Sequence, residues 1–365
     1  MTTRVMVVDD ASIFRRVISD ALSGIDGVEV VGTAANGKQA LARMESLQPD
    51  LITLDIEMPE MNGIEVLSAM RASGINTSVV VLSSVTVRGG RMTIRALEYG
   101  AFDFITKPEG GSPPENMARL REGLRPIIQA LGRRREIRSI LNSKEPDSHA
   151  AHLAGCPSTP GAGRVRKGTR SGPPIVLIGV STGGPVALAE VLPALPGGLG
   201  APVFIVQHMP PHFTAALAER LQTKCAMPVT EARDGEIASP NHAYLAPGGR
   251  HMKLNVGRSG EIIIGITDDP PEKGCRPSVD CLFRSAALHF PGRSIAAILT
   301  GMGNDGTDGM RMLKMGGSQT IAQDEASCVV FGMPREAILA GVVDTIVPLS
   351  QIAGAIMRAL AEAAS

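Results

Sequence analysis

Short apolar runs rich in β-branched residues alternate with longer stretches of helical periodicity through the first 108 residues. These runs are RVMVV, VEVVGTA, DLITL, SVVVL and DFIT. Runs of this length, separated by segments of helix length, predict five βα units and therefore a doubly wound parallel sheet. A final helix is expected over about 115–131, after Pro113 and Pro114, because proline is well tolerated in the first turn of a helix.

The same kind of pattern begins again after Pro173. The apolar runs are now PIVLIGV, PVFIVQH, HAYLAP, EIIIGI, SIAAILT and SQTIAQD, and helical stretches such as FTAALAERLQ and VDCLFRSAAL fall between them. This series predicts a second doubly wound parallel-sheet α/β domain with a core of its own.

Between the two series the periodicity disappears, and Gly, Pro, Ser and basic residues dominate. Nine basic and three acidic side chains lie between Arg133 and Arg170. We interpret this stretch as a flexible linker whose charge is solvated; a docking strip for an acidic partner is the alternative. The predicted organisation is a first domain over 1–131, a basic linker over 132–172 and a second domain over 173–365.

Composition narrows the class of protein. The chain has 365 residues, 44% of them apolar, with 36 basic and 36 acidic side chains, so charge gives no reason to expect nucleic-acid binding. No helix-turn-helix or basic recognition helix follows residue 173, which argues against a DNA-binding output. The five cysteines form no CxxC pair, and no stretch approaches the roughly 20 apolar residues of a membrane span. These features predict a cytoplasmic protein with reduced thiols and no membrane insertion.

Polar side chains follow the strands of the first domain at the sheet edge where ligands usually bind. They are Asp9 and Asp10 after the first strand, Asp55 at the third, Ser83 and Ser84 at the fourth, and Lys107 at the fifth. Three carboxylates that converge in one crevice repel one another, and a divalent cation with a preference for oxygen ligands, such as Mg²⁺, would relieve that repulsion. The lysine can neutralise remaining charge, and a serine hydroxyl can bind a phosphoryl oxygen.

The stretches VVDD, LDIEMPEMNG and DFITKP resemble the response-regulator receiver domain. The resemblance implies that a histidine kinase is the phosphodonor and that Asp55 becomes an aspartyl phosphate. It also implies a magnesium site made by Asp10, Asp55 and the carbonyl of Glu57, with Asp9 acting through water. The remaining implied roles are a switch hydroxyl at Ser83, a switch aromatic at Phe104, a phosphate-pairing lysine at Lys107 and a cis bond before Pro108.

In the second domain, Ser181 lies in IGVSTGGPV, where a strand turns into a helix. Such a junction can expose a nucleophile or cradle a phosphate. No Walker lysine or GxGxxG accompanies the glycines, which weakens the phosphate interpretation. A serine nucleophile requires an imidazole base and a carboxylate that orients it.

His208 is the best placed base, because it follows the strand PVFIVQ at the same sheet edge as Ser181. Structural or surface roles are expected for five of the other six histidines: His152 lies in the linker, His289 is expected in the core on an apolar helix, and His212, His242 and His251 are expected to be surface loop residues. The carboxylate is expected from the loop GMGNDGTDGM. We choose Asp305 there, since Asp308 lies nearer the helix body and fits a capping role.

Long ordered stretches of the second half resemble the catalytic domain of the chemotaxis protein-glutamate methylesterase, or CheB, family. They are IGVSTGGP, QHMPPHFTAALAERL, YLAPGG, RPSVDCLF, ILTGMGNDG and IAQDEASCVVFGMPREA. The resemblance implies Ser181 as nucleophile, His208 as base and Asp305 as its orienter. It adds the Met302 amide as an oxyanion donor and Thr182 as a support for the imidazole.

The activity implied is demethylation of glutamate γ-methyl esters on chemoreceptors, with deamidation of receptor glutamines as a related reaction. No cofactor is expected in the catalytic domain. A receiver docked over Ser181 would block a receptor helix until Asp55 is phosphorylated. The alternative is a phosphorylation-dependent binding protein that does little or no hydrolysis. Cys275 and Cys281, which flank RPSVD, have no expected role beyond small buried thiols.

Overall fold

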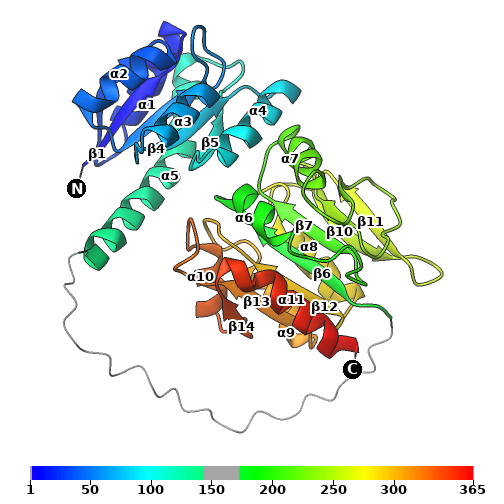
Figure 1. Cartoon of the computed structure of the whole chain (residues 1–365). Coiled ribbons are helices and arrows are strands. Elements are labelled where there is room, and N and C mark those ends of the chain that lie inside the picture. The colour runs from blue at the N-terminus through cyan, green and yellow to red at the C-terminus, as the bar shows by residue number, and fades with distance from the viewer. Residues whose placement is uncertain (1, 143–171, 365) are drawn as a thin grey trace, which may run out of the picture.

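The computed structural model describes residues 2–142 and 172–364, and Figure 1 shows them as two α/β units in contact. The first unit contains a five-stranded sheet in the order β2-β1-β3-β4-β5, in which all neighbours are parallel. Its strands are β1 (Thr3–Val8), β2 (Val28–Ala34), β3 (Leu51–Asp55), β4 (Ser78–Ser83) and β5 (Asp103–Thr106). This order is the flavodoxin-like one, so the predicted fold class of the first half is confirmed.

Helices cover both faces of this sheet, and local capping fixes where several of them begin. They are α1 (Ser12–Ser23), α2 (Gly37–Leu47), α3 (Gly63–Ala72), α4 (Val87–Glu98) and α5 (Pro113–Asn142). The side chains of Asn36, Asn62 and Thr86 accept backbone N–H groups in the first turns of α2, α3 and α4. Each cap satisfies a donor that the helix itself leaves free.

Helix α5 is longer than the sequence analysis expected. It was predicted to end at about residue 131, but it continues to Asn142, so residues 132–142 of the predicted linker are helical. The apolar periodicity does stop there, yet the sequence RRREIRSILN contains good helix formers, which favour continuation of the helix. The remainder of the predicted linker, 143–171, lies outside the described residues.

The second unit is a seven-stranded sheet in the order β14-β13-β12-β6-β7-β9-β8, again parallel throughout. Its strands are β6 (Ile175–Val180), β7 (Val203–Gln207), β8 (Val229–Glu231), β9 (Ala243–Leu245), β12 (Ser294–Ile298), β13 (Gln319–Gln323) and β14 (Thr345–Val347). Its helices are α6 (Gly184–Val191), α7 (Phe213–Gln222), α8 (Val279–His289), α9 (Thr307–Met315), α10 (Met333–Leu339) and α11 (Leu349–Ala364). The second predicted parallel-sheet domain is therefore also present.

Two strands of the second unit lie outside its parallel sheet. β10 (His251–Val256) and β11 (Ile262–Thr267) pair with each other as an antiparallel hairpin. The sequence analysis placed EIIIGI in the parallel series, and that placement was wrong. Alternate residues of the hairpin, such as Leu254 and Ile264, are buried in the core that α8 shares, and the Leu254 N–H donates to Ser285 Oγ at 2.9 Å. The hairpin thus braces α8 rather than extending the sheet.

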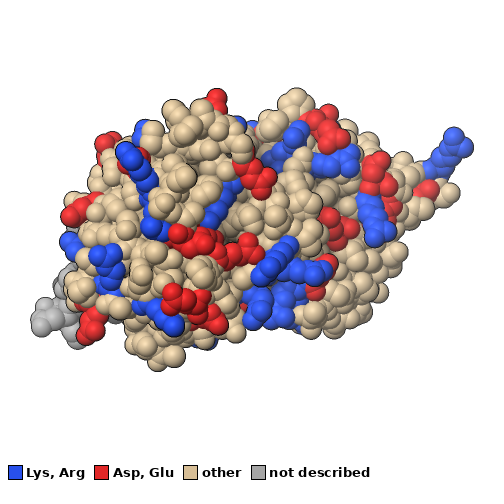
Figure 2. Space-filling model, turned by 90° about the horizontal axis from the view of Figure 1, so that it is seen from above, with Lys and Arg blue, Asp and Glu red and all other residues tan. Residues whose placement is uncertain are grey.

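Charge is mixed over the surface. Figure 2 shows acidic and basic side chains interleaved on one face, and neither sign covers it. No helix within the described ranges is both long enough and apolar enough to cross a membrane.

Candidate active site and acidic pocket

The register of β6 and β7 places Ser181 and His208 side by side. Val180 pairs with Gln207, and each of the two functional residues follows its strand by one position. The Ser181 N–H donates to the Thr300 carbonyl at 3.0 Å, and the side-chain Nε2 of Gln207 donates to the Ser181 carbonyl at 2.9 Å. The backbone that carries the serine is therefore held from both neighbouring strands.

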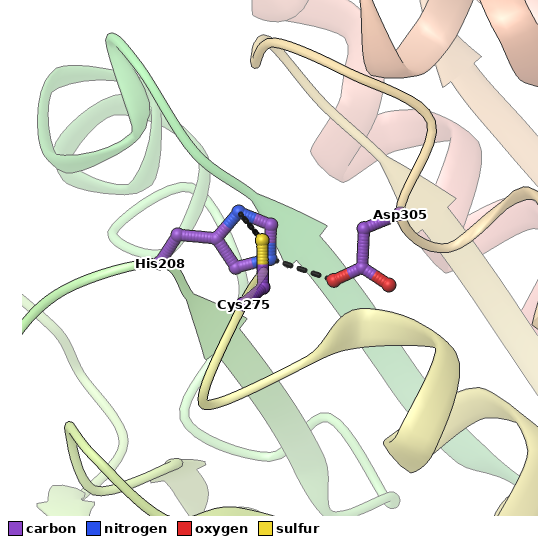
Figure 3. A group of neighbouring side chains, drawn as sticks. All are labelled: His208, Cys275 and Asp305. Carbon is purple, nitrogen blue, oxygen red and sulfur yellow. Dashed lines mark hydrogen bonds and ion pairs between the residues drawn. The ribbon is translucent and has the colours of Figure 1, made fainter. Parts of the chain in front are cut away.

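His208 and Asp305 meet at this edge. Their Nε2 and Oδ2 atoms are 2.7 Å apart, and Figure 3 shows the carboxylate beside the imidazole ring. Asp305, in the loop between β12 and α9, is buried against the N-terminus of α8. There it accepts hydrogen bonds from Ser278 Oγ at 2.9 Å, the Val279 N–H at 2.7 Å and the Asp280 N–H at 2.9 Å. These donors, together with the helix N-terminus, favour the charged carboxylate.

The two partners shift each other's pKa in opposite directions. Burial disfavours the charged form of Asp305, but the hydrogen bond and charge of His208 outweigh it and lower the Asp305 pKa to about 2. Burial likewise opposes the imidazolium of His208, yet Asp305, with a further contribution from Cys275, raises the His208 pKa to about 9. The pair is held as a carboxylate and an imidazolium at neutral pH.

Cys275 occupies a position that the sequence analysis missed. It is half-buried rather than buried, and its Sγ lies 3.7 Å from His208 Nδ1, the nitrogen that Asp305 leaves unused (Figure 3). Within the described part of the chain, Ser181 Oγ makes no hydrogen bond, to His208 or to any other group. Catalytic contacts are often loose in the absence of substrate. No motif links Cys275 to His208 in sequence, since the two are 67 positions apart.

The loop after β12 runs directly against the serine. A Cβ atom added to Gly301 would lie 2.7 Å from the Ser181 Cβ, so only glycine allows this approach. The next residue, Met302, has a backbone N–H that finds no acceptor among the described residues. That arrangement leaves a donor available for an oxyanion. Thr182 has no hydrogen bond to His208; its side chain instead interacts with Asp103 of the first unit.

Two of the other histidines do not lie where they were expected. His289 is exposed at the end of α8, because the apolar face of that helix is formed by residues such as Leu282 and Phe283. His251 was expected on the surface and is fully buried in β10, with hydrogen bonds on both ring nitrogens. His212 is exposed and His242 half-buried, while His152 lies outside the described residues.

Three acidic residues of the first unit form one cluster, which we call the acidic pocket. Ligand oxygens of Asp9, Asp10 and Asp55 lie within 4.8 Å of one another. Lys107 Nζ is 2.6 Å from Asp55 Oδ2 and 2.7 Å from Asp9 Oδ2. Burial raises the pKa of Asp55, Lys107 opposes that rise, and the charge of Asp9 adds to it. A cluster of hard oxygen ligands with too little positive charge fits a magnesium ion.

The remaining expected residues of this pocket surround Asp55. The Glu57 N–H donates to Asp55 Oδ1 at 3.2 Å, which places the Glu57 backbone at the pocket. Ser83 is buried, and its hydroxyl donates to the Gly89 carbonyl at 3.3 Å. The expected cis bond before Pro108 is absent: the only cis peptide among residues 2–142 and 172–364 precedes Pro277, and nothing in the structure explains the difference.

The two units meet beside the serine. Phe104 stacks on Phe213 with ring centroids 4.8 Å apart, and α4 packs on α7 so closely that a Cβ atom at Gly90 would lie 3.1 Å from the His212 carbonyl oxygen. Figure 1 shows α4 facing α7 across this boundary. Burial raises the pKa of Asp103 to about 6, against hydrogen bonds from its neighbour's amide and from Thr182. The first unit therefore contacts the residue next to Ser181.

Ion pairs frame this contact. Glu98 accepts hydrogen bonds from Arg220 Nε at 2.9 Å and from Lys224, and Arg91 pairs with Glu219 at 3.0 Å. These side chains are partly exposed, so each pair contributes only about 0.2–1 kcal/mol.

Comparison with known proteins assigns both halves. The CheB methylesterase family matches residues 176–356, and the response regulator receiver domain matches residues 5–119. A protein of Desulfotalea psychrophila named protein-glutamate methylesterase/protein-glutamine glutaminase is 48% identical over 97% of this chain and 98% of its own length. The chain belongs to the CheB methylesterase family.

Other members of the family agree in length and architecture. A Geobacillus kaustophilus protein of the same name is 44% identical and is matched over 99% of both chains. The crystal structure of the Thermotoga maritima CheB methylesterase catalytic domain is 41% identical, covers 51% of this chain and 98% of its own, and superposes with a TM-score of 0.50. The expected two-part organisation of receiver and methylesterase is thus confirmed at the level of the family.

Proposed function

We propose that the chain hydrolyses γ-methyl esters of glutamate side chains in chemoreceptors, with Ser181 as the nucleophile. The observation that carries this proposal is the His208–Asp305 pair, 2.7 Å apart, beside Ser181 at the carboxyl edge of the sheet. A pure binding module has no need for a buried, ionised carboxylate that orients an imidazole next to a serine.

In the first half of the reaction, Ser181 Oγ attacks the ester carbonyl carbon and His208 Nδ1 takes the hydroxyl proton. Asp305, on Nε2, holds the ring and stabilises the imidazolium that forms. The Met302 N–H and the N-terminus of α6 receive the negative charge on the former carbonyl oxygen. The C–O bond to the methoxy group then breaks as His208 gives its proton to the departing methoxy oxygen, and methanol is released.

The second half reverses these roles. His208 takes a proton from water, the hydroxide attacks the acyl-serine, and Ser181 leaves with the proton that His208 returns. The product is the free glutamate side chain. For this path Nδ1 must be accessible, so the Cys275 thiol has to move away from it or lie beside the proton path.

Deamidation of receptor glutamines is a second activity that the same residues would support. The acyl-serine is identical, and ammonia replaces methanol as the leaving group. The names of the relatives from Desulfotalea psychrophila and Geobacillus kaustophilus include protein-glutamine glutaminase, which favours this reaction over unrelated ester hydrolysis.

Control of the site would come from the receiver. Its contacts with Thr182 and Phe213 support a receiver that covers the approach to Ser181, so that a receptor helix would reach the serine only after the units separate. A histidine kinase would supply the phosphoryl group to Asp55. Magnesium, held by Asp9, Asp10, Asp55 and the Glu57 carbonyl, would neutralise the charge of the phosphorylated carboxylate. Ser83 and Lys107 would bind its oxygens, and Phe104 would carry the change to the stack with Phe213.

The test is methanol release from methylated receptor membranes, with and without a small phosphodonor and Mg²⁺, for the parent protein and for Ser181→Ala. We expect release that rises with the phosphodonor and is lost in the variant. Folded protein that releases neither methanol nor ammonia from its own organism's receptors would instead support the phosphorylation-dependent binding role. In that case Ser181→Ala would retain full signalling.

A further inference from the structure

His251 has no assigned role, yet it is fully buried and makes two hydrogen bonds that define its protonation state. The Ser278 N–H donates to Nδ1 at 3.2 Å, and Nε2 lies 3.1 Å from the Pro270 carbonyl oxygen. A backbone N–H can only donate and a carbonyl can only accept. Nδ1 therefore carries the lone pair and Nε2 carries the proton, so the ring is neutral and present as one tautomer.

Ser278 connects this ring to the active site. It is the N-cap of α8, its Oγ accepts the Cys281 N–H, and the same hydroxyl donates to Asp305 Oδ1 at 2.9 Å. The next two backbone N–H groups, of Val279 and Asp280, also bind Asp305. Three of the four donors to that carboxylate thus come from the segment that His251 fixes, and the fourth is His208 itself.

The N-terminus of α8 is held by side-chain hydrogen bonds on two sides. Asp280 is tied to the Gly309 N–H at 2.7 Å and to Lys273 at 2.7 Å, which fixes the helix on the side of α9. On the hairpin side, His251 supplies the hydrogen bond to the Ser278 backbone. A rigid ring that accepts on one edge and donates on the other spans the gap between Ser278 and Pro270, which no smaller polar side chain would do in one fixed orientation.

We infer that His251 is a positioning residue of the active site, which holds the Ser278–Asp280 donors on Asp305 and through them fixes the orientation of His208. The inference rests on the proposed role of Asp305. It also gives the β10–β11 hairpin a function, since the hairpin adds nothing to the parallel sheet and carries the ring that braces α8.

The decisive experiment compares two substitutions that each keep half of the imidazole. In His251→Asn the amide oxygen lies where Nδ1 was and can still accept the Ser278 N–H. In His251→Gln the terminal NH₂ lies near Nε2 and keeps only the Pro270 contact. We expect kcat within about threefold of the parent for the Asn variant, about a 10- to 100-fold lower kcat for the Gln variant, and an unchanged KM in both. His242→Gln, in a half-exposed histidine that bonds Thr230, is the matched control.

A second readout does not depend on turnover. Nitrogen-15 NMR of the histidine rings reports their tautomers and the protonation of His208, whose facing titratable groups are Asp305 and Cys275. In the parent, His251 should appear as the Nε2–H tautomer. In the Gln variant the His208 pKa should fall from about 9 toward its ordinary value of 6.5, because its carboxylate partner is less well held.

The outcomes separate cleanly. Equal loss in the Asn and Gln variants, in proportion to their loss of thermal stability and with the His208 pKa unmoved, would mean that His251 merely fills the core and would overturn the inference. If the protein hydrolyses no receptor ester at all, the NMR titration still decides whether His251 positions Asp305. The proposed activity and the positioning role can therefore fail independently.

Discussion

Asp55 and Asp305 are both buried carboxylates at the carboxyl edge of a parallel sheet, yet their pKa values move in opposite directions. Burial raises the pKa of Asp55, which has one lysine partner and a second carboxylate nearby. Asp305 is as deeply buried, but it faces an imidazole and three donors at a helix N-terminus, and its pKa falls to about 2. Burial does not decide the charge of a carboxylate; the number of donors aimed at it does.

The difference matches the chemistry that each residue would perform. Asp305 is kept charged by His208 and by its hydrogen-bond donors, and it can therefore orient a base at any pH near neutrality. Asp55 carries a charge that its own pocket disfavours, which suits a group that binds a cation and then accepts a phosphoryl group. Each half of the chain uses the carboxyl edge of its own sheet. The second half holds a permanent charge there, on Asp305, and the first half holds a charge that changes, on Asp55.

The largest effect should come from removing the permanent charge. Asp305→Asn should lower kcat by about 10⁴-fold, because the amide cannot hold His208 in its working tautomer. Asp55→Asn should leave the unstimulated rate unchanged. Asp308→Asn is the matched control, since Asp308 is an exposed carboxylate in the same loop region that pairs with Lys273 and Arg311. Single-turnover methanol release measures all three, and a tenfold or smaller loss in Asp305→Asn would contradict the proposed role.

The pH dependence should show which group limits the rate. His208 accepts a proton only when neutral, and with a pKa of about 9 its neutral fraction rises tenfold per pH unit below that value. We therefore expect kcat/KM to rise about 50-fold between pH 7 and pH 9, where half of His208 is neutral, with background ester hydrolysis subtracted using Ser181→Ala. Asp305 stays charged across this range. A rate that is flat above pH 7 would assign the base to another group.

The same pair should leave a mark on stability with the opposite trend. The folded pKa of His208, about 9, lies above the unfolded value of 6.5, so its contribution to folding is complete below pH 6.5 and is lost as pH rises through 9. Denaturant unfolding of the parent at pH 6 and pH 9.5, compared with the same pair of measurements on His208→Gln, tests this. The parent should lose more stability over the interval than the variant does.

The charge on Asp55 should affect only the increase in rate that a phosphodonor causes. A small phosphodonor with Mg²⁺ should raise methanol release by roughly 5- to 150-fold, the usual range of coupling between two sites. Removal of the metal by chelation, or the Asp55→Ala substitution, should abolish the increase and leave the unstimulated rate. Stimulation that persists in Asp55→Ala would place the phosphoryl group elsewhere.

The smallest effect should come from the boundary between the halves. Glu98→Gln removes the charge that pairs with Arg220 and Lys224, and partly exposed pairs contribute about 0.2–1 kcal/mol each. Loss of both pairs should therefore raise the unstimulated rate by about two- to thirtyfold, with correspondingly weaker stimulation. Glu122→Gln, at an exposed position on α5, is the control and should change neither rate.

The sequence predicts those parts of the fold and of the candidate site that leave a local pattern of apolar and polar residues. Apolar runs placed β5 at Asp103–Thr106 and α7 at Phe213–Gln222, because a short apolar run and a helical apolar period are local patterns that can be seen in the sequence itself. The hairpin strand at His251–Val256 escaped detection, since one side faces solvent and its polar residues resemble a loop. Chain order at the sheet edge was enough to bring Asp305 to His208.

Contacts between segments that are distant in the chain could not be predicted from the sequence. His251 resembles a surface histidine until Ser278 and Pro270 are seen on its two nitrogens. Cys275 looks like any small thiol until the loop that carries it folds over His208. In both cases the partners are set by tertiary packing, which leaves no local periodicity to read.

The stack of Phe104 in β5 on Phe213, together with the ion pair of Glu98 in α4 with Arg220 in α7, also determines how often the two units separate without a signal. Contacts of this size open and close on microsecond to millisecond timescales, so a fraction of molecules would be open without any phosphoryl group. That fraction fixes the background against which a signal is read, and salt would shift it by screening Glu98 and Arg220. The resting methylation of the receptors, and with it the memory of the sensory pathway, would then be set at this boundary as much as at the serine.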